Sequence, residues 1–158
     1  MTEINGPASR VKGAAESFGL SVISRIMPEK TRTAEEAAAA CGCSVDEIVK
    51  SLVFRGAQSG KGVLLLVSGA NRVNEDKVAG PLGEQIMRPD AAFVRALTGF
   101  AIGGIPPFGH ATPLPTYIDR DLLAHETVWA AAGTPHAIFA IDPKALAEAI
   151  GAIVIDVK

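Results

Sequence analysis

The run Val63-Leu64-Leu65-Leu66-Val67 constrains the fold of this chain more than any other stretch. Five consecutive apolar residues without alternation are typical of a strand that is buried on both faces. Such a strand needs other elements packed above and below it, which requires a layered domain. We expect residues 1–158 to form one such domain, since this length suits a single hydrophobic core. The run is far too short to span a membrane, and we expect no membrane association.

Helix and strand signals surround this run. Thr33 and Ser44 each precede a glutamate by three residues, a capping motif that satisfies free amides at a helix start. The pattern predicts helices over residues 7–18, 33–40, 44–49 and 74–79, from Asp90 onward and from Asp142 to Gly151, and strands over residues 21–27, 50–55, 63–67, 127–131, 137–141 and 153–157 and near Tyr117. Helices and strands interleave without a regular βαβ rhythm, so we expect an α+β or irregular α/β fold with a mixed sheet.

The segment from Thr98 to His110 holds four glycines and two prolines in thirteen residues, yet its other residues are mostly apolar. A flexible linker would be rich in serine and lysine, so we predict an ordered loop packed against the domain. Glycines let backbone N–H groups approach a ligand, and prolines hold a loop in one shape. The loop is either a tightly packed connection or a ligand site, in which the amides of Gly103 and Gly104 stabilise an oxyanion.

Lys50 shares a predicted strand with Leu52 and Phe54, and the three side chains should point to the same face. A cation in phase with two large apolar residues must reach water, form a pair or bind a ligand. One interpretation is a strand-end lysine whose ammonium reaches solvent. The other is an ammonium at the floor of a pocket, where it contacts a carbonyl or phosphate oxygen.

Three other groups of residues are weaker candidates for a site. His110 closes the glycine-rich loop and is either a proton carrier, a ligand contact or an ordinary packed histidine. Asn71 and Arg72 follow the buried strand, where polar residues often line a site but also form simple turns. Gly133 and Thr134 link two predicted strands. They either form only a turn or also lie beside the glycine-rich loop.

Several functional classes lack their motifs. Cys41 and Cys43 lie two positions apart among scattered histidines, which favours neither a disulfide nor a zinc site, so we expect reduced thiols and no metal or cofactor. No secretory signal is visible, and a cytoplasmic protein is expected. Dinucleotide, phosphate-loop and Gly-x-Ser-x-Gly motifs are missing, so catalysis would use water. A net charge of −2 disfavours DNA binding and limits any contact with nucleic acid to a local one.

Taken together, these residues resemble the YbaK and prolyl-tRNA synthetase-associated domain family. The matching segments are Thr-Ala-Glu-Glu-Ala-Ala at 33–38, Ile-Val-Lys-Ser-Leu-Val-Phe at 48–54, Val-Ser-Gly-Ala-Asn-Arg at 67–72, Gly-Phe-Ala-Ile-Gly-Gly-Ile-Pro-Pro-Phe-Gly-His at 99–110 and Gly-Thr-Pro at 133–135. They occur in the family's order over nearly the whole chain. The lysine segment and the Gly-Gly-x-Pro-Pro loop are specific in combination, and neither is specific alone.

The resemblance implies a barrel-like mixed sheet flanked by helices and a free-standing editing domain. Such proteins hydrolyse the ester that joins a wrong amino acid to tRNA, often tRNA for proline, and prolyl-tRNA synthetase is a further expected partner. The resemblance implies that Lys50 is the key functional residue and that the loop Gly99–Pro107 shapes the amino-acid pocket. Together with the residue patterns above, we expect the catalytic residues to be Lys50, Gly103, Gly104 and His110. The residues expected to bind the substrate are Gly99, Phe100, Ala101, Ile102, Ile105, Pro106, Asn71, Arg72, Gly133 and Thr134.

The chain departs from the YbaK branch of this family at residues 133–136. That branch tends to carry a Gly-x-Arg-Gly turn where this chain has Gly-Thr-Pro-His, and the glycine-rich loop resembles the ProX or PrdX-like branches. The amino acid removed is therefore left open among alanine, serine, cysteine or another small residue. The alternative function is a non-catalytic module that binds aminoacyl-adenylate-like or tRNA 3′-end ligands.

Overall fold

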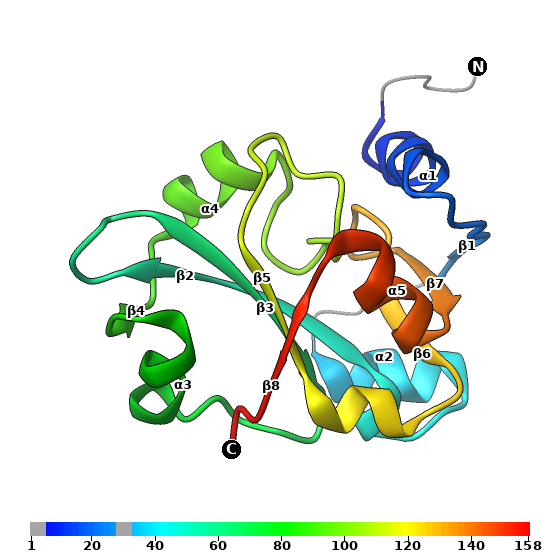
Figure 1. Ribbon diagram of the computed structural model, residues 1–158. Helices are drawn as coiled ribbons and strands as arrows, with labels where there is room; N and C mark the ends of the chain where they lie inside the picture. Colours follow the sequence, from blue (N-terminus) through cyan, green and yellow to red (C-terminus); the bar gives the residue numbers. More distant parts are fainter. Residues whose placement is uncertain (1–5, 28–32) are drawn as a thin grey trace.

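Two β-sheets form the centre of the computed structural model, which describes residues 6–27 and 33–158 (Figure 1). In the described residues, one sheet has five strands in the order β4-β2-β3-β5-β8, and the other has three in the order β1-β7-β6. The strands are β1 (Ser24–Ile26), β2 (Val49–Gly56), β3 (Gly62–Ser68), β4 (Ile86–Met87), β5 (Thr116–Asp119), β6 (Val128–Ala131), β7 (Ala137–Ile141) and β8 (Ile153–Ile155). The helices are α1 (Pro7–Ser17), α2 (Ala34–Cys41), α3 (Glu75–Leu82), α4 (Ala91–Thr98) and α5 (Pro143–Ile150), with the 3₁₀ turns η1 (Val45–Glu47) and η2 (Arg120–Ala124).

Strand β3 is the central strand of the larger sheet, and every residue in it is buried. Leu64 and Leu66 pack into the main apolar cluster, while Leu65 and Val67 pack into a second cluster on the opposite face. The prediction of a strand buried on both faces is therefore confirmed. β3 pairs antiparallel with β2 and parallel with β5, which confirms the predicted mixed sheet and the α+β fold.

The smaller sheet covers one side of the main cluster with its inner face. Val128 and Phe139 belong to that cluster, whereas Trp129 alternates to the outer face. The two sheets meet at an isolated bridge between Ile48 and Trp129. Within the part of the chain that the structure describes, the sheets do not close into a barrel, so the barrel-like sheet implied by the resemblance is open.

Local signals set most of the helix boundaries. The Glu36 N–H donates to Thr33 Oγ1 and the Thr33 N–H donates to Glu36 Oε1, each at 3.1 Å, which confirms the capping motif at α2. Asp142 caps α5, with Pro143 as its first residue. The predictions were less accurate for short elements: β1 covers only three residues of the strand predicted over 21–27, and the two-residue strand β4 was not predicted. No helix among residues 6–27 and 33–158 has the length and apolar character needed to cross a bilayer.

Candidate functional site

A pocket of about 370 Å³ lies where the two sheets meet. This volume falls in the range of small-molecule sites. Its walls come from five parts of the chain: the first turn of α2, residues 48–52, the glycine after β3, the loop after α4, and strands β6 and β7. Of the residues expected at the site, Lys50, Ile102, Gly103 and Ile105 line this pocket. Segments that are far apart in the sequence are thus brought to one cavity.

The backbone of Ser51 faces this pocket. In an antiparallel ladder, successive residues direct their N–H and C=O groups to opposite edges. The Ile48 carbonyl accepts from the N–H of Gly69, which follows β3, at 2.8 Å. The backbone N–H and C=O groups of Ile48 and Lys50 are therefore directed toward β3, and those of Ser51 are directed to the opposite edge of the strand. β4 pairs with β2 only from Arg55 onward, so the strand edge at Ser51 is unpaired among the described sheets.

The Ser51 hydroxyl is the second unusual feature of this edge. Its Oγ is buried and has no hydrogen-bond partner within the described residues. A buried polar atom without a partner costs about 1–3 kcal/mol, so it marks a position where a ligand group would be stabilising. Sequence reasoning missed Ser51, because a serine inside a strand carries no signal beyond its place next to Lys50.

Lys50 is half-buried in the pocket wall, and its Nζ donates a hydrogen bond to the backbone carbonyl of Asn71. Burial is the main cause that lowers the pKa of the ammonium below its ordinary value of 10.5. The Glu35 carboxylate, which also lines the pocket, opposes this shift, and Arg72 adds to it. The placement fits the pocket interpretation of Lys50 rather than a strand-end lysine in solvent.

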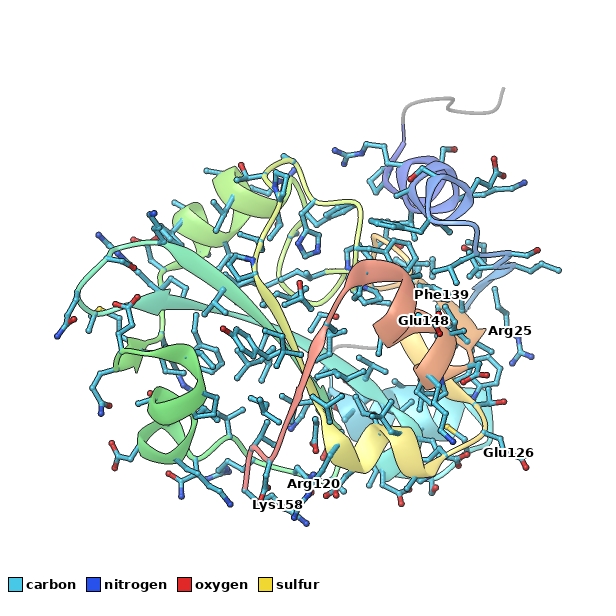
Figure 2. The ribbon with its side chains drawn as sticks, in the orientation of Figure 1. Arg25, Arg120, Glu126, Phe139, Glu148 and Lys158 are labelled. Carbon is cyan, nitrogen blue, oxygen red and sulfur yellow. The ribbon has the colours of Figure 1, made fainter. Side chains whose placement is uncertain are left out.

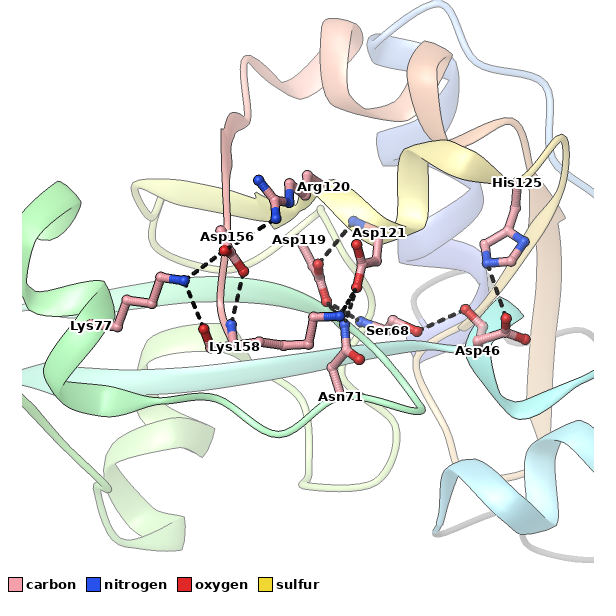
Figure 3. Close-up of polar contacts among 10 residues, drawn as sticks. All are labelled: Asp46, Ser68, Asn71, Lys77, Asp119, Arg120, Asp121, His125, Asp156 and Lys158. Carbon is pink, nitrogen blue, oxygen red and sulfur yellow. Dashed lines mark hydrogen bonds and ion pairs between the residues drawn. The ribbon is translucent and has the colours of Figure 1, made fainter.

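Asn71 accepts the hydrogen bond of Lys50 but does not line the pocket. Figure 3 shows Asn71 beside Asp119 and Asp121. Its Nδ2 donates to one carboxylate oxygen each of Asp119 and Asp121, both at 2.8 Å. Asp119 is 1% exposed and also accepts from the Ser68 N–H at 3.1 Å. These two aspartates were not singled out from the sequence. Arg72, the other residue expected here, is exposed and lies outside the pocket lining.

Gly103 lines the pocket. Its φ of +99° lies in the region that glycine adopts without strain. Within residues 6–27 and 33–158, its N–H has no hydrogen-bond partner. Ile102 and Ile105 on either side line the same cavity, and the loop from Gly104 to Phe108 is buried, which confirms the prediction of an ordered loop.

Gly104 has a packing role instead of the expected donor role. Its N–H donates to the Ala101 carbonyl at 3.0 Å, so this amide is already used in a turn. A Cβ on Gly104 would lie 2.7 Å from the Thr134 Cα and 2.9 Å from the Gly133 oxygen. The loop therefore rests directly on the 133–134 turn, and Gly133 and Thr134 support it from behind rather than lining the pocket.

Four more loop residues expected to bind substrate lie outside the pocket lining. Gly99 ends α4 with a φ of +79°. Phe100 is buried in the main cluster, Pro106 is buried within the loop, and Ala101 is exposed. Their positions indicate that they shape the loop and its packing.

His110 lies away from Lys50, beside a different hollow next to α1. Its Nε2 lies 2.7 Å from the Pro106 carbonyl, and because a carbonyl only accepts, this nitrogen carries the proton. Burial lowers the pKa of the ring below its ordinary value. The structure thus does not bring His110 to the pocket, and no chemical step is assigned to it. Across the described part of the chain, no three His, Cys, Asp or Glu side chains form a group suited to a metal.

The sequence profile described as "Aminoacyl-tRNA editing domain" matches residues 28–149. The chain belongs to this family. This editing domain is similar to the crystal structure of a candidate trans-editing enzyme for prolyl tRNA synthetase, with 48% identity, a TM-score of 0.91 and 99% of both chains covered. It is also similar to the crystal structure of hypothetical protein APE2540, with 33% identity, a TM-score of 0.87 and coverage of 94% of this chain and 98% of the other.

Two curated relatives support the same family. The uncharacterized protein YwhH of Bacillus subtilis (strain 168) is 33% identical to the editing domain over 116 residues, which is 73% of either chain. A proline–tRNA ligase of Desulfovibrio desulfuricans is 30% identical over 112 residues, which is 70% of this chain and 19% of the ligase. The family resemblance seen in the sequence motifs is confirmed.

Proposed function

We propose that this editing domain is a trans-acting aminoacyl-tRNA deacylase. Its substrate is a small mischarged amino acid of the alanine, serine or cysteine class, esterified to tRNA for proline. The observation that most supports this is the convergence of Lys50, Ser51 and Gly103 on one pocket. The similarity over the whole chain to a candidate trans-editing enzyme for prolyl tRNA synthetase supports the choice of tRNA.

The three groups suit hydrolysis of an activated ester. Such a reaction needs a held carbonyl, a placed water and stabilisation of the oxyanion, and one well-placed donor contributes about 3 kcal/mol. In this proposal the Gly103 amide donates to the carbonyl oxygen, and the Lys50 ammonium faces the developing negative charge. The backbone of Ser51, at the unpaired strand edge that lines the pocket, binds the attacking water. The water oxygen bonds to the carbonyl carbon, the bond to the ribose oxygen breaks, and the ribose oxygen takes the proton that the water releases.

The pocket walls favour a small acyl group. The lining of the pocket combines small residues with bulky ones. The residues that leave room are Ala34, Ala37, Gly69, Ala130 and Ala131, and the residues that limit the volume are Ile48, Ile102, Ile105, Trp129 and Ile138. One methylene changes binding in an apolar pocket by about 1–3 kcal/mol, so the walls alone separate alanine, serine and cysteine only weakly. A panel of charged tRNAs is therefore the decisive measurement.

The proposal is tested by incubating the purified protein with tRNA for proline charged with alanine, serine, cysteine or proline and following the loss of the acyl group. We expect turnover of at least one small acyl group. Lys50→Ala should lower kcat/KM by roughly 100-fold or more, the loss seen when one oxyanion donor is removed. Lys61→Ala is the matched control, because Lys61 is an exposed lysine in the turn between β2 and β3.

Two results would contradict the proposal. Unchanged deacylation by Lys50→Ala would remove the lysine from the mechanism. Binding of the charged tRNAs without acyl loss across the panel would instead favour the non-catalytic binding module.

A further inference from the structure

Arg25 of β1 belongs to the face of the small sheet that lines the pocket. Residues directly opposite in an antiparallel ladder carry their side chains on the same face, about 5 Å apart. Arg25 pairs with Ile138, and Ile138 pairs with Ala131. Ile138 and Ala131 both line the pocket. Figure 2 shows Arg25 at the edge of this sheet, and Arg25 is exposed. Its guanidinium contacts the ring of Trp129, which lines the pocket, so we place it at the pocket rim.

The Arg25 guanidinium is held over an aromatic ring at this rim. It lies 5.0 Å from the centre of the Trp129 ring, and Trp129 itself lines the pocket. A stacked guanidinium keeps its N–H donors available in the plane of the group, and stacking reduces the entropy lost when it binds. Arg25 is exposed, and no carboxylate of the described residues forms an ion pair with it. Among the residues that the structure describes, it is thus an oriented cation without a carboxylate partner.

We propose that Arg25 binds a backbone phosphate in the single-stranded 3′ end of the tRNA whose acyl group occupies the pocket. This inference rests on the proposed function. When the acyl group lies beside Lys50, the rest of the tRNA must extend out through the mouth of the pocket. This brings the phosphates of its 3′ end to the rim. The chain has a net charge of −2, which favours a local contact with the tRNA over a generally basic surface. The planar fork of a guanidinium matches a phosphate.

The test uses an uncharged, fluorescently labelled oligonucleotide with the 3′-terminal sequence of tRNA and measures its binding by anisotropy over a series of salt concentrations. Arg25→Ala should weaken binding by roughly tenfold, as expected for the loss of a charge-assisted hydrogen bond. The slope of log K against log salt should fall by about 0.7, the value for one phosphate contact on a single strand. Arg25→Lys keeps the charge without the stack and should give an intermediate affinity.

Arg55→Ala is the matched control. Arg55 is also exposed and also stacks on an aromatic ring, 5.3 Å from the centre of Phe93. It lies on β2 five residues beyond Lys50, about 17 Å along the strand. We expect the Arg55 variant to bind the oligonucleotide as the wild type does.

A kinetic comparison separates this inference from the proposed function. Arg25→Ala should lose roughly ten times more kcat/KM on alanyl-tRNA than on alanyl-adenosine, an ester that has no phosphate. If no charged tRNA is deacylated, the proposed function fails, but the binding measurement still tests Arg25. The inference is overturned if the wild type does not bind the oligonucleotide, if Arg25→Ala keeps wild-type affinity and salt slope, or if Arg55→Ala causes an equal loss.

Discussion

Gly104→Ala should displace the loop that carries the Gly103 amide, although Gly104 does not line the pocket. The added Cβ would lie 2.7 Å from the Thr134 Cα and 2.9 Å from the Gly133 oxygen. Both are backbone atoms, so no side-chain rotation can make room. Ordinary contact begins at 3.4 Å, so the loop and the 133–134 turn must separate by about 0.7 Å.

The cost of this separation is steric. Gly104 is not among the glycines with positive φ, so alanine can adopt its backbone conformation without torsional strain. Overpacking of this kind typically costs about 1–3 kcal/mol of the free energy of unfolding. In a chain of this size that corresponds to a decrease in Tm of about 2–12 °C. A displacement approaching 1 Å at a catalytic donor can lower the rate by about 100-fold, so we expect a drop in kcat/KM of about 10- to 100-fold.

Thermal unfolding followed by circular dichroism, together with deacylation of alanyl-tRNA, measures both effects. Gly13→Ala is the control, because Gly13 lies in α1 and an added Cβ would meet nothing within 4 Å. That variant should gain about 0.5–1 kcal/mol of stability and keep wild-type activity. Wild-type stability and kcat/KM in Gly104→Ala would refute the view that contact with the 133–134 turn holds the loop in place.

Three further predictions follow from buried groups. His110→Asn should lower Tm but leave the pH profile of deacylation unchanged. Because burial lowers the pKa of His110, the stability of the wild type should fall as the pH decreases below 6.5. The variant should lose this pH dependence of stability. A changed activity profile would place the ring in the mechanism. Asp119→Asn should lower the free energy of unfolding in urea by about 1–3 kcal/mol and also lower kcat/KM. The new amide N–H group would face the N–H donors of Ser68 and Asn71 instead of accepting from them. Full activity would contradict the view that Asp119 holds Asn71, and through it Lys50, in place. Burial chiefly raises the pKa of Cys41 from 9.0 to about 11. Iodoacetamide at pH 8, followed by mass spectrometry, should therefore label it roughly tenfold more slowly than after unfolding, because the higher nucleophilicity of the thiolate offsets part of its lower population. Equal rates would contradict this environment.

The features that the sequence predicted well depend on near neighbours in the chain. The capping motif of Thr33 with Glu36 and the start of α5 at Asp142 involve groups within a few residues. The apolar run at Val63–Val67 predicted its own burial, because no polar residue interrupts it. These elements were sufficient to predict a mixed α+β domain.

The composition of the pocket could not be predicted in the same way. Ser51 becomes notable only when the register with β3 shows which edge its backbone faces and when its hydroxyl is seen to lack a partner. Gly103 and Gly104 are adjacent glycines, and the sequence alone does not tell which amide is free and which is used in a turn. Trp129 and Ile138 line the cavity because the small sheet presents its outer face to it, which is a property of the packed sheets.

Strands β6 and β7 place the pocket and the core on the two sides of a single backbone layer. Trp129 and Ile138 face the cavity, while their sequence neighbours Val128 and Phe139 pack in the interior. A volume change behind this layer therefore shifts the surface of the cavity. If the proposed function holds, the range of amino acids accepted would change through interior substitutions that never contact a ligand, and a survey of selectivity confined to cavity residues would overlook them.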